Sequence, residues 1–304
     1  MLHTIFSVLF PLIALITLGY TLKQRQWLED GFWRGAEKLN YYVLFPIMLF
    51  LNLATAQIQI YIIQDVVLVI SIITVLVCAV LYSLKAIYRI NFARFGVYVQ
   101  SMLRFNTYIG IAAVSTLFGQ AGMTVFAVIM VFFIPVVNTI SVLAFTKPAD
   151  MQFGKIFISL AKNPLILGCL VGGLYNHNLS GLGIWQGMNQ LLKQMAACSL
   201  PLGLMCVGAA LKFGQINLDL WRIVWNTTGR MICMPLLGLG VCKIMGISTL
   251  TTQVLVLFFA LPTASASYVL TKVLGGDSEL MAKVISVQTL VAGLTLPLFL
   301  TFII

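Results

Sequence analysis

Long apolar stretches separated by short polar ones run through the whole chain. Hydropathy divides it into ten segments, at 3–22, 39–57, 62–84, 96–118, 121–146, 156–175, 187–211, 219–242, 249–274 and 280–303. A helix needs roughly 20 predominantly apolar residues to cross the hydrocarbon core of a bilayer, and these segments have about that length. The pattern therefore predicts an all-α polytopic membrane protein with ten transmembrane helices.

Helix-breaking positions recur along the chain at an offset of 155 residues. Three pairs of landmarks carry the repeat: Gly19-Tyr20 with Leu174-Tyr175, Pro46 with Pro201, and Asn106-Thr107 with Leu261-Pro262. We interpret the chain as two five-helix halves, 1–148 and 149–304. Because five is odd, the second half must be inserted upside down. Inverted repeats with broken helices, here crossed helices 4 and 9, are typical of secondary transporters.

The basic residues indicate how the segments are oriented. Loops after odd-numbered segments hold fourteen Lys and Arg residues, whereas loops after even-numbered segments hold only Lys243. Cytoplasmic loops are enriched in these residues, so both termini are expected on the outer side. Stretches 27–38 and 150–162 combine charges with aromatic residues and are expected to form interfacial helices.

Composition excludes several classes of protein. Hydrophobic residues make up 61% of the chain and charged residues 9%, which does not fit a soluble domain. The net charge of +10 is scattered singly through loops, so it indicates membrane topology rather than nucleic-acid binding. The six cysteines lie in apolar runs without metal-type spacing, which favours small buried residues over a disulfide or a metal site. We expect the lipid bilayer as a partner and no cofactor.

Two motifs interrupt the fourth and ninth segments. Residues 104–110 read RFNTYIG, and residues 260–267 read ALPTASAS. Proline removes a backbone donor, and Asn, Thr and Ser can satisfy freed backbone groups, so both helices can unwind at bilayer depth. Half-helix N-termini that meet there would favour an anion. We expect a substrate site at these residues: Arg104, Asn106, Thr107, Pro262, Thr263 and Ser265.

The alternative is that Pro262 merely kinks a packed helix and Asn106 makes a hydrogen bond between helices. Other polar residues in the segments can line the same cavity or serve in packing: Asn52, Asn138, Ser199, Gln288 and Thr289. We include Asn138 and Gln288 in the predicted site.

Three cations remain inside the apolar segments, where a charge is costly and by default indicates function. Lys193 is near the end of its segment and is expected to reach the outer surface. Arg230 lies near the middle of the eighth segment, where either a substrate role or a contact with carbonyls is open. Arg104 precedes the break by two residues, so it is the better candidate for neutralising a substrate carboxylate.

The acidic residues are informative by their positions. All eight Asp and Glu residues lie in loops or at segment edges, and no segment has a central carboxylate. Ion-coupled pumps usually keep acidic groups at the site. The chain is therefore expected to carry an anion, with uniport favoured, while sodium or proton coupling stays open. It also lacks the HExxH, GxSxG and Walker motifs, so it is not expected to be an enzyme.

The motifs at 104–110, at 163–168 (NPLILG) and at 261–267, followed by Gly275-Gly276-Asp277, resemble the auxin efflux carrier family, in its bacterial branch of malonate or malate permeases. The resemblance covers the whole chain. It implies a scaffold of helices 1, 2, 6 and 7, a mobile transport part of helices 3–5 and 8–10, and homodimers in the bacterial inner membrane. Many members have a proline where this chain has Ala112, which predicts a less sharply broken fourth helix.

The leading hypothesis from the sequence is a secondary carrier of a small organic anion, such as a mono- or dicarboxylate, working by elevator-like alternating access. A sodium- or proton-coupled symporter of the same fold, and a channel or non-transporting membrane receptor, are the alternatives.

Overall fold

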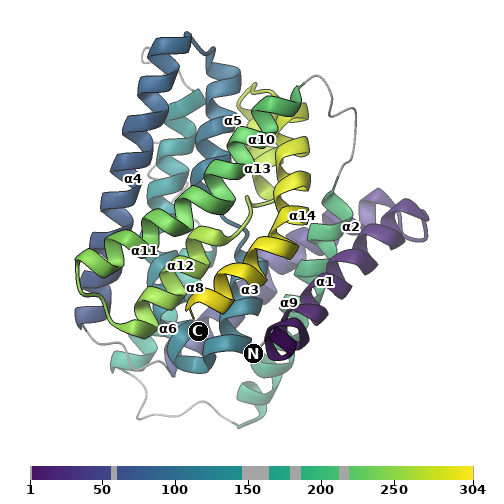
Figure 1. Cartoon of the computed structure of the whole chain (residues 1–304). Coiled ribbons are helices and arrows are strands. Elements are labelled where there is room, and N and C mark those ends of the chain that lie inside the picture. The colour runs from purple at the N-terminus through teal and green to yellow at the C-terminus, as the bar shows by residue number, and fades with distance from the viewer. Residues whose placement is uncertain (1, 56–59, 146–163, 179–185, 212–218, 304) are drawn as a thin grey trace.

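The computed structural model describes residues 2–55, 60–145, 164–178, 186–211 and 219–303, and Figure 1 shows their arrangement. These residues form helices and no strand. The helices are α1 (Leu2–Gln24), α2 (Asp30–Leu39), α3 (Phe45–Ala54), α4 (Ile60–Tyr88), α5 (Phe92–Leu103), α6 (Thr107–Phe145), α8 (Pro164–Asn178), α9 (Gln186–Ala210), α10 (Leu220–Thr228), α11 (Met234–Ile244), α12 (Thr249–Ala260), α13 (Ala266–Val273) and α14 (Ser278–Ile303).

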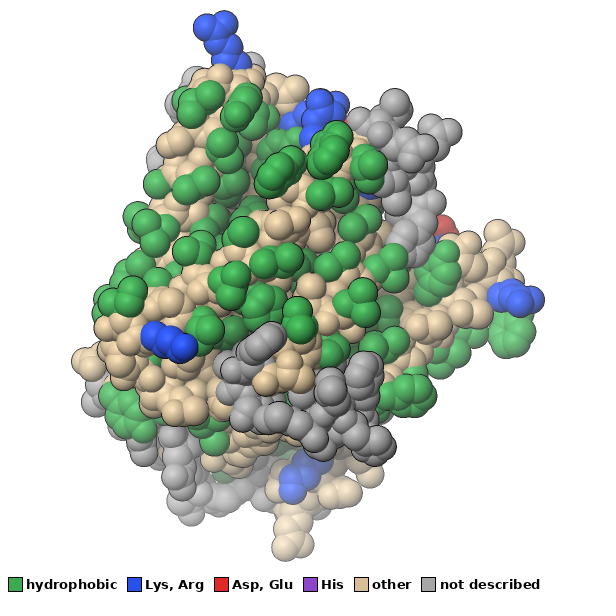
Figure 2. Space-filling view, in the orientation of Figure 1, with side chains coloured by type: hydrophobic (Ala, Val, Ile, Leu, Met, Phe, Trp, Pro, Cys, Tyr) green, Lys and Arg blue, Asp and Glu red, His purple; other side chains and the backbone are tan. Residues whose placement is uncertain are grey.

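The surface of the bundle is that of a protein embedded in a membrane. Within the described ranges, 4 helical stretches are long and apolar enough to cross a bilayer: Tyr61–Tyr88, Phe92–Phe145, Gln186–Ala210 and Ser278–Thr301. Large apolar side chains point outward on them, including Val75 on α4 and Leu294 on α14, which are 67% and 79% exposed. Figure 2 shows one face where hydrophobic side chains predominate and blue basic side chains are sparse. Outward apolar surface of this extent is stable only against lipid.

Several expected segments consist of more than one helix. The second expected segment consists of a π-helical turn, η1 (Asn40–Leu44), followed by α3. The eighth expected segment consists of α10, another π-helical turn, η5 (Gly229–Cys233), and α11. A proline, Pro46 or Pro235, follows each π turn by two residues. Because a proline ring clashes with the carbonyl four residues before it, a wider preceding turn relieves the clash.

Other expectations from the sequence can be compared with the described residues. Stretch 27–38 forms the amphipathic helix α2, whose buried residues are Trp33 and Ala36. Gly119, with φ of 56°, separates the two helical parts of α6, where the fourth and fifth segments were expected to meet. Stretch 150–162, residue Asn163 and the boundary between the halves at 148/149 lie outside the described residues. Cys198 and Cys233 are exposed, so the expectation that the cysteines are buried is wrong for these two.

Glycines let two helix pairs pack with their backbones in contact. A Cβ atom on Gly208 of α9 would lie 1.8 Å from the carbonyl oxygen of Ile16 on α1. On α8, a Cβ on Gly168 or Gly172 would lie 2.6 or 2.7 Å from carbonyl oxygens of α3, those of Pro46 and Phe50. Small residues at this spacing allow close helix packing in membranes, where dispersion and not the hydrophobic effect holds helices together.

The helices fall into two groups by their contacts. Helices α1, α2, α3, α8 and α9 pack chiefly on one another, and α4, α5, α6 and α10 to α14 form the second group. Contacts between the groups run mainly through α6 and α14. The start of α1 and the end of α14 lie at the same end of the bundle (Figure 1).

Candidate functional site

Both predicted interruptions are present as gaps between helices. Helix α5 ends at Leu103 and α6 begins at Thr107, while α12 ends at Ala260 and α13 begins at Ala266. The first break therefore has three non-helical residues and the second has five. The fourth segment therefore resumes its helix after a shorter break than the ninth. Ala112, which stands where many family members have a proline, lies inside α6.

The helices that lead into the breaks match closely. Each has 12 residues, and each is capped at its N-terminus by a side chain, Asn91 or Ser248, that accepts the amide of the third residue beyond it. Each ends in an extended residue: Arg104 has φ/ψ of −72°/142°, and Leu261 has −69°/141°. These caps are 157 positions apart (248 − 91 and 261 − 104), two more than the 155-residue offset seen in the sequence. Arg104, not Asn106, is thus the counterpart of Leu261.

The two breaks are in direct contact. The backbone amide of Asn106 donates to the carbonyl oxygen of Pro262 at 2.7 Å. The side-chain oxygen of Asn106 accepts the amide of Ile109, which caps the first turn of α6. A backbone amide that leaves its helix must find another acceptor when no water is available. Asn106 and Pro262 therefore hold the two unwound stretches together.

Arg230 serves the C-terminal ends of both helices. Its side chain is fully buried, with Nε donating to the carbonyl oxygen of Leu261 at 2.8 Å and Nη1 donating to that of Met102 at 2.6 Å. Met102 is in the last turn of α5 and Leu261 directly follows α12, and carbonyl oxygens at such C-terminal ends have no partner within their own helices. The contact with carbonyls, one of the two possibilities that the sequence left open, is thus present.

Arg104 lies beside the first break with a neutral partner. Its Nη1 donates to the side-chain oxygen of Asn138 at 3.0 Å, and both residues are half-buried. Asn138 lies on the second part of α6, so this contact joins the break to the fifth segment. By contrast, Lys193 on α9 is exposed.

Thr263 and Gln288 link the second break to neighbouring helices. The amide of Thr263 donates to the side-chain oxygen of Gln288 at 3.0 Å, and its hydroxyl lies 2.7 Å from the same oxygen and 2.8 Å from the carbonyl oxygen of Ser101. Gln288 in turn donates to the side-chain oxygen of Asn226 at 2.9 Å. This chain of contacts ties α5, α10 and α14 to the break.

The remaining two predicted residues lie where the second half-helices begin. Thr107 is the first residue of α6 and Ser265 directly precedes α13, and both are half-buried. Ser265 makes no side-chain hydrogen bond that caps its helix. The structure thus brings all nine predicted site residues to the two breaks or onto their immediate contacts.

Sequence reasoning missed a group of polar residues next to the breaks. Gln100 donates to the hydroxyl of Thr271 at 3.0 Å, and that hydroxyl donates to the carbonyl of Ser267 at 2.8 Å. All three are fully buried. Gln100 and Thr271 each stand beside one other polar residue in an otherwise apolar run, which resembles an ordinary packing contact. Ser267 ends the second motif, and Gln100 and Thr271 are each four residues from a motif, which was the available signal.

Buried polar atoms without a partner gather at the breaks. In the described part of the chain there are six: Trp33 Nε1, Gln100 Oε1, Asn106 Nδ2, Thr227 Oγ1, Arg230 Nη2 and Ser267 Oγ. All but the first belong to the breaks or to helices that contact them. Because an unpaired buried polar group costs about 1–3 kcal/mol, such a concentration calls for a ligand or bound water.

Aromatic rings form a layer against the breaks. The centroid of the Phe105 ring lies 4.7 Å from that of Phe258, 6.0 Å from that of Phe126 and 6.1 Å from that of Phe133. The four side chains come from the first break, from α6 and from α12, and all are buried. We call them the phenylalanine layer. They place apolar material beside the polar crossing, and a low local dielectric strengthens electrostatic interactions.

Two of the other polar residues considered from the sequence act in packing. The hydroxyl of Ser199 donates to the side-chain oxygen of Asn40 at 2.8 Å, and the Asn40 amide donates back to the carbonyl of Ser199 at 2.9 Å. This pair joins η1 to α9. The amide of Asn52 donates to the carbonyl of Met48 within its own helix.

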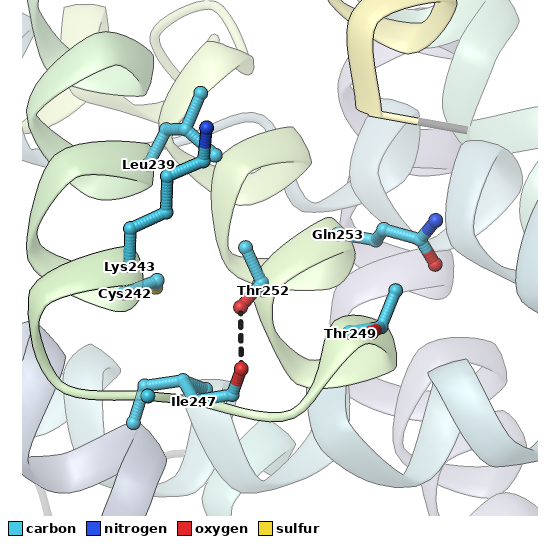
Figure 3. Close-up of a pocket in the computed structure, with 8 residues that line it drawn as sticks. Leu239, Cys242, Lys243, Ile247, Thr249, Thr252 and Gln253 are labelled. Atoms are coloured by element: carbon cyan, nitrogen blue, oxygen red, sulfur yellow. Dashed lines mark hydrogen bonds between the residues drawn. The ribbon is translucent and has the colours of Figure 1, made fainter.

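A surface pocket lies elsewhere, at the turn that joins α11 to α12. It is open and is lined by Leu239, Cys242, Lys243, Gly246, Ile247, Thr249, Thr252 and Gln253. Figure 3 shows these side chains around the turn, with Thr252 donating to the carbonyl of Ile247 at 3.3 Å. None of the nine predicted site residues lines it, so the crossing and not this pocket is the candidate site.

Comparison with known proteins identifies the family. A family model described as "Membrane transport protein" matches residues 4–300, almost the whole chain. The chain belongs to the membrane transport protein family. This is the auxin efflux carrier family that the motifs resemble, and it favours a transporter over an enzyme. No individual curated protein matches the chain.

Proposed function

We propose that this membrane transport protein is a secondary carrier of a small organic anion, with its substrate site where the two breaks cross. The observation that carries the proposal is the pairing of Asn106 with Pro262, beside two guanidinium groups that have no carboxylate partner. The ion pairs of the described residues, such as Arg94 with Asp277, lie near helix ends instead. A site with fixed cations and no fixed anion favours a negatively charged substrate.

Polar groups at the crossing supply a ligand with donors. Helices α6 and α13 begin here, and helix N-termini attract anions through their free amides and their dipoles. Asn106 Nδ2 and Arg230 Nη2 are buried donors without a partner. Arg104, Thr107 and Ser265 are half-buried, so part of each side chain is accessible. We assign charge neutralisation to Arg104 and orientation of the substrate to Asn106, Thr107 and Ser265.

The proposal includes ten membrane spans in two inverted halves. Two observations support it. The helices that enter the breaks have matching lengths and caps, as repeated units should. The two close backbone contacts, α1 with α9 and α3 with α8, each join a helix of the first half to one of the second, which is the pattern that a twofold relation between halves produces. On this topology both termini face outward across the bacterial inner membrane.

We further propose that the two groups of helices move against each other as an elevator. The group of α1, α2, α3, α8 and α9 corresponds to the scaffold that the family resemblance implies, and the other group holds the complete crossing. The close glycine contacts that we described lie within the scaffold group, which makes it the rigid member. A homodimer through the scaffold belongs to the same proposal.

The test is transport by the purified protein in liposomes against a panel of mono- and dicarboxylates. We expect saturable flux of at least one carboxylate and trans-acceleration by the same compound. Conduction without trans-acceleration would instead identify a channel, and neither flux nor binding across the panel would refute the proposal. Loss of flux when sodium is replaced or when the proton gradient is collapsed would identify a coupled symporter.

A further inference from the structure

Two helix C-termini meet at one buried point of this protein. Helices α5 and α12 both end at the crossing, and the carbonyls of Met102 and Leu261 point at the same side chain. Each helix end carries about half a negative charge from its aligned peptide dipoles. In a medium without water, two such ends side by side need a positive charge between them.

Arg230 provides that charge from within the chain. Its side chain is 0% exposed, and the two bonds at 2.6 and 2.8 Å are made to carbonyl oxygens, not to a carboxylate. The planar fork of a guanidinium can donate to two separate acceptors at once, which the ammonium of a lysine does less well. The π-helical turn at Gly229–Cys233 carries Arg230 between the two helix ends.

A buried hydroxyl group lies close in the chain to Arg230. Thr227 is near the end of α10, three residues before Arg230 in the chain. Its hydroxyl oxygen is buried and has no partner, with 7% of the residue exposed. Removal of the guanidinium would leave a cavity bordered by the carbonyl oxygens of Met102 and Leu261, its two acceptors. Oxygen atoms of these kinds are the ligands that hard metal cations prefer.

We propose that Arg230 is a built-in counter-cation, which takes the place that a bound alkali cation would otherwise fill between the ends of α5 and α12. Replacement of Arg230 by a small neutral residue then creates a binding site for sodium or guanidinium ions. The consequence for coupling rests on the proposed function: because the cation is covalently attached, the carrier assembles its substrate site and completes its cycle without sodium.

The first experiment measures thermal unfolding of purified Arg230→Ala in detergent. Sodium chloride and guanidinium chloride are titrated at low millimolar concentration, with choline chloride as the control for ionic strength. In choline we expect the variant to melt several degrees below wild type. Sodium or guanidinium should recover part of this loss in a saturable way, since a ligand of the folded state stabilises it by RT ln(1 + [L]/Kd).

Two controls define the result. Wild type should melt at the same temperature in all three salts, and Arg104→Ala, which removes a half-buried arginine near the same break, should show no preference among them. Equal melting of Arg230→Ala in choline, sodium and guanidinium overturns the proposal. So does stabilisation of wild type by sodium over choline.

A pair of larger residues keeps the test decisive if Arg230→Ala does not fold. Arg230→Lys retains the charge, and Arg230→Met has a comparable length without it. We expect the lysine variant to fold and to ignore sodium, and the methionine variant to be stabilised by sodium or not to fold. A methionine variant as stable as the lysine variant in choline contradicts the proposal.

A flux measurement separates this inference from the proposed function. With any carboxylate that the wild-type protein carries, flux in choline should equal flux in sodium within about twofold. Sodium-dependent wild-type flux overturns the counter-cation role and leaves anion transport standing. Failure of every carboxylate to be carried refutes the proposed function, while the melting experiment still decides the role of Arg230, because it needs no substrate.

Discussion

Arg104 donates a hydrogen bond to the side-chain oxygen of Asn138 at 3.0 Å, so a charged group beside the first break is held by a neutral one. The positive charge of Arg104 is therefore available to an anion. We expect Arg104→Gln to fold with a melting temperature near that of wild type and to bind a carried anion about thirtyfold or more weakly. Removal of one partner of a desolvated charge pair costs roughly 2–5 kcal/mol.

Lys193→Gln is the matched control for that prediction, because Lys193 is exposed on α9 and away from the breaks. Its anion affinity should stay near the wild-type value. Isothermal titration and thermal unfolding of both variants are the measurements. Normal affinity in Arg104→Gln, with a lowered melting temperature, would show that Arg104 ties down the helix end and does not neutralise substrate.

The reciprocal pair of Asn40 and Ser199 should couple η1 to α9 energetically. Both residues are fully buried, and their two hydrogen bonds are 2.8 and 2.9 Å long. We expect Asn40→Ala and Ser199→Ala each to lower the free energy of unfolding by about 1–3 kcal/mol. The double variant should lose less than the sum of the two, because the bond between the side chains can be lost only once. Strict additivity in this cycle would contradict the pairing.

Two adjacent glycines on α8 give a direct test of close helix packing. A Cβ on Gly172 would lie 2.7 Å from the carbonyl oxygen of Phe50 on α3, whereas a Cβ on Gly173 meets nothing within 4 Å. Gly172→Ala should therefore lower the melting temperature by several degrees, since overpacking costs roughly 1–3 kcal/mol. Gly173→Ala should be neutral or slightly stabilising, because alanine favours a helix. Equal melting of the two variants would argue against the contact of α3 with α8.

Glu37 on the amphipathic helix α2 should make stability depend on pH. Burial raises the pKa of its carboxyl above the ordinary value. Between the ordinary pKa and the raised one, the folded protein holds a proton that the unfolded chain has lost, so stability falls as the pH rises through this window. Glu37→Gln should flatten that part of the curve of melting temperature against pH. A variant curve parallel to that of wild type would exclude Glu37 as the cause.

The sequence predicted the breaks well because they depend on local chemistry. Proline at 262 and asparagine at 106 act on the backbone next to them, so their residue types alone indicate where a helix ends. The equal offset between halves was less accurate. It rested on three pairs of single landmark residues, and the caps of α5 and α12 show a shift of two residues at the third pair.

The contacts of Arg230 could not be predicted in the same way. Its partners are carbonyl oxygens of residues 128 and 31 positions away, and a carbonyl leaves no trace in the residue type. The contacts of Gln100 and Ser267 could not be predicted either, because they depend on where three helices meet. Sequence patterns identify residues that break helices, whereas they do not show which distant backbone groups those breaks leave exposed.

The phenylalanine layer gives the crossing an electrical consequence. Closely packed rings around Phe105 and Phe258 leave little room for water or small ions beside the breaks. A thin barrier that resists ion leakage is where most of a membrane's voltage drops. A charge carried past such a barrier gains or loses about 2.3 kcal/mol for each 100 mV. If the proposed carrier moves its anion past the four rings, this barrier makes that step sensitive to the membrane voltage.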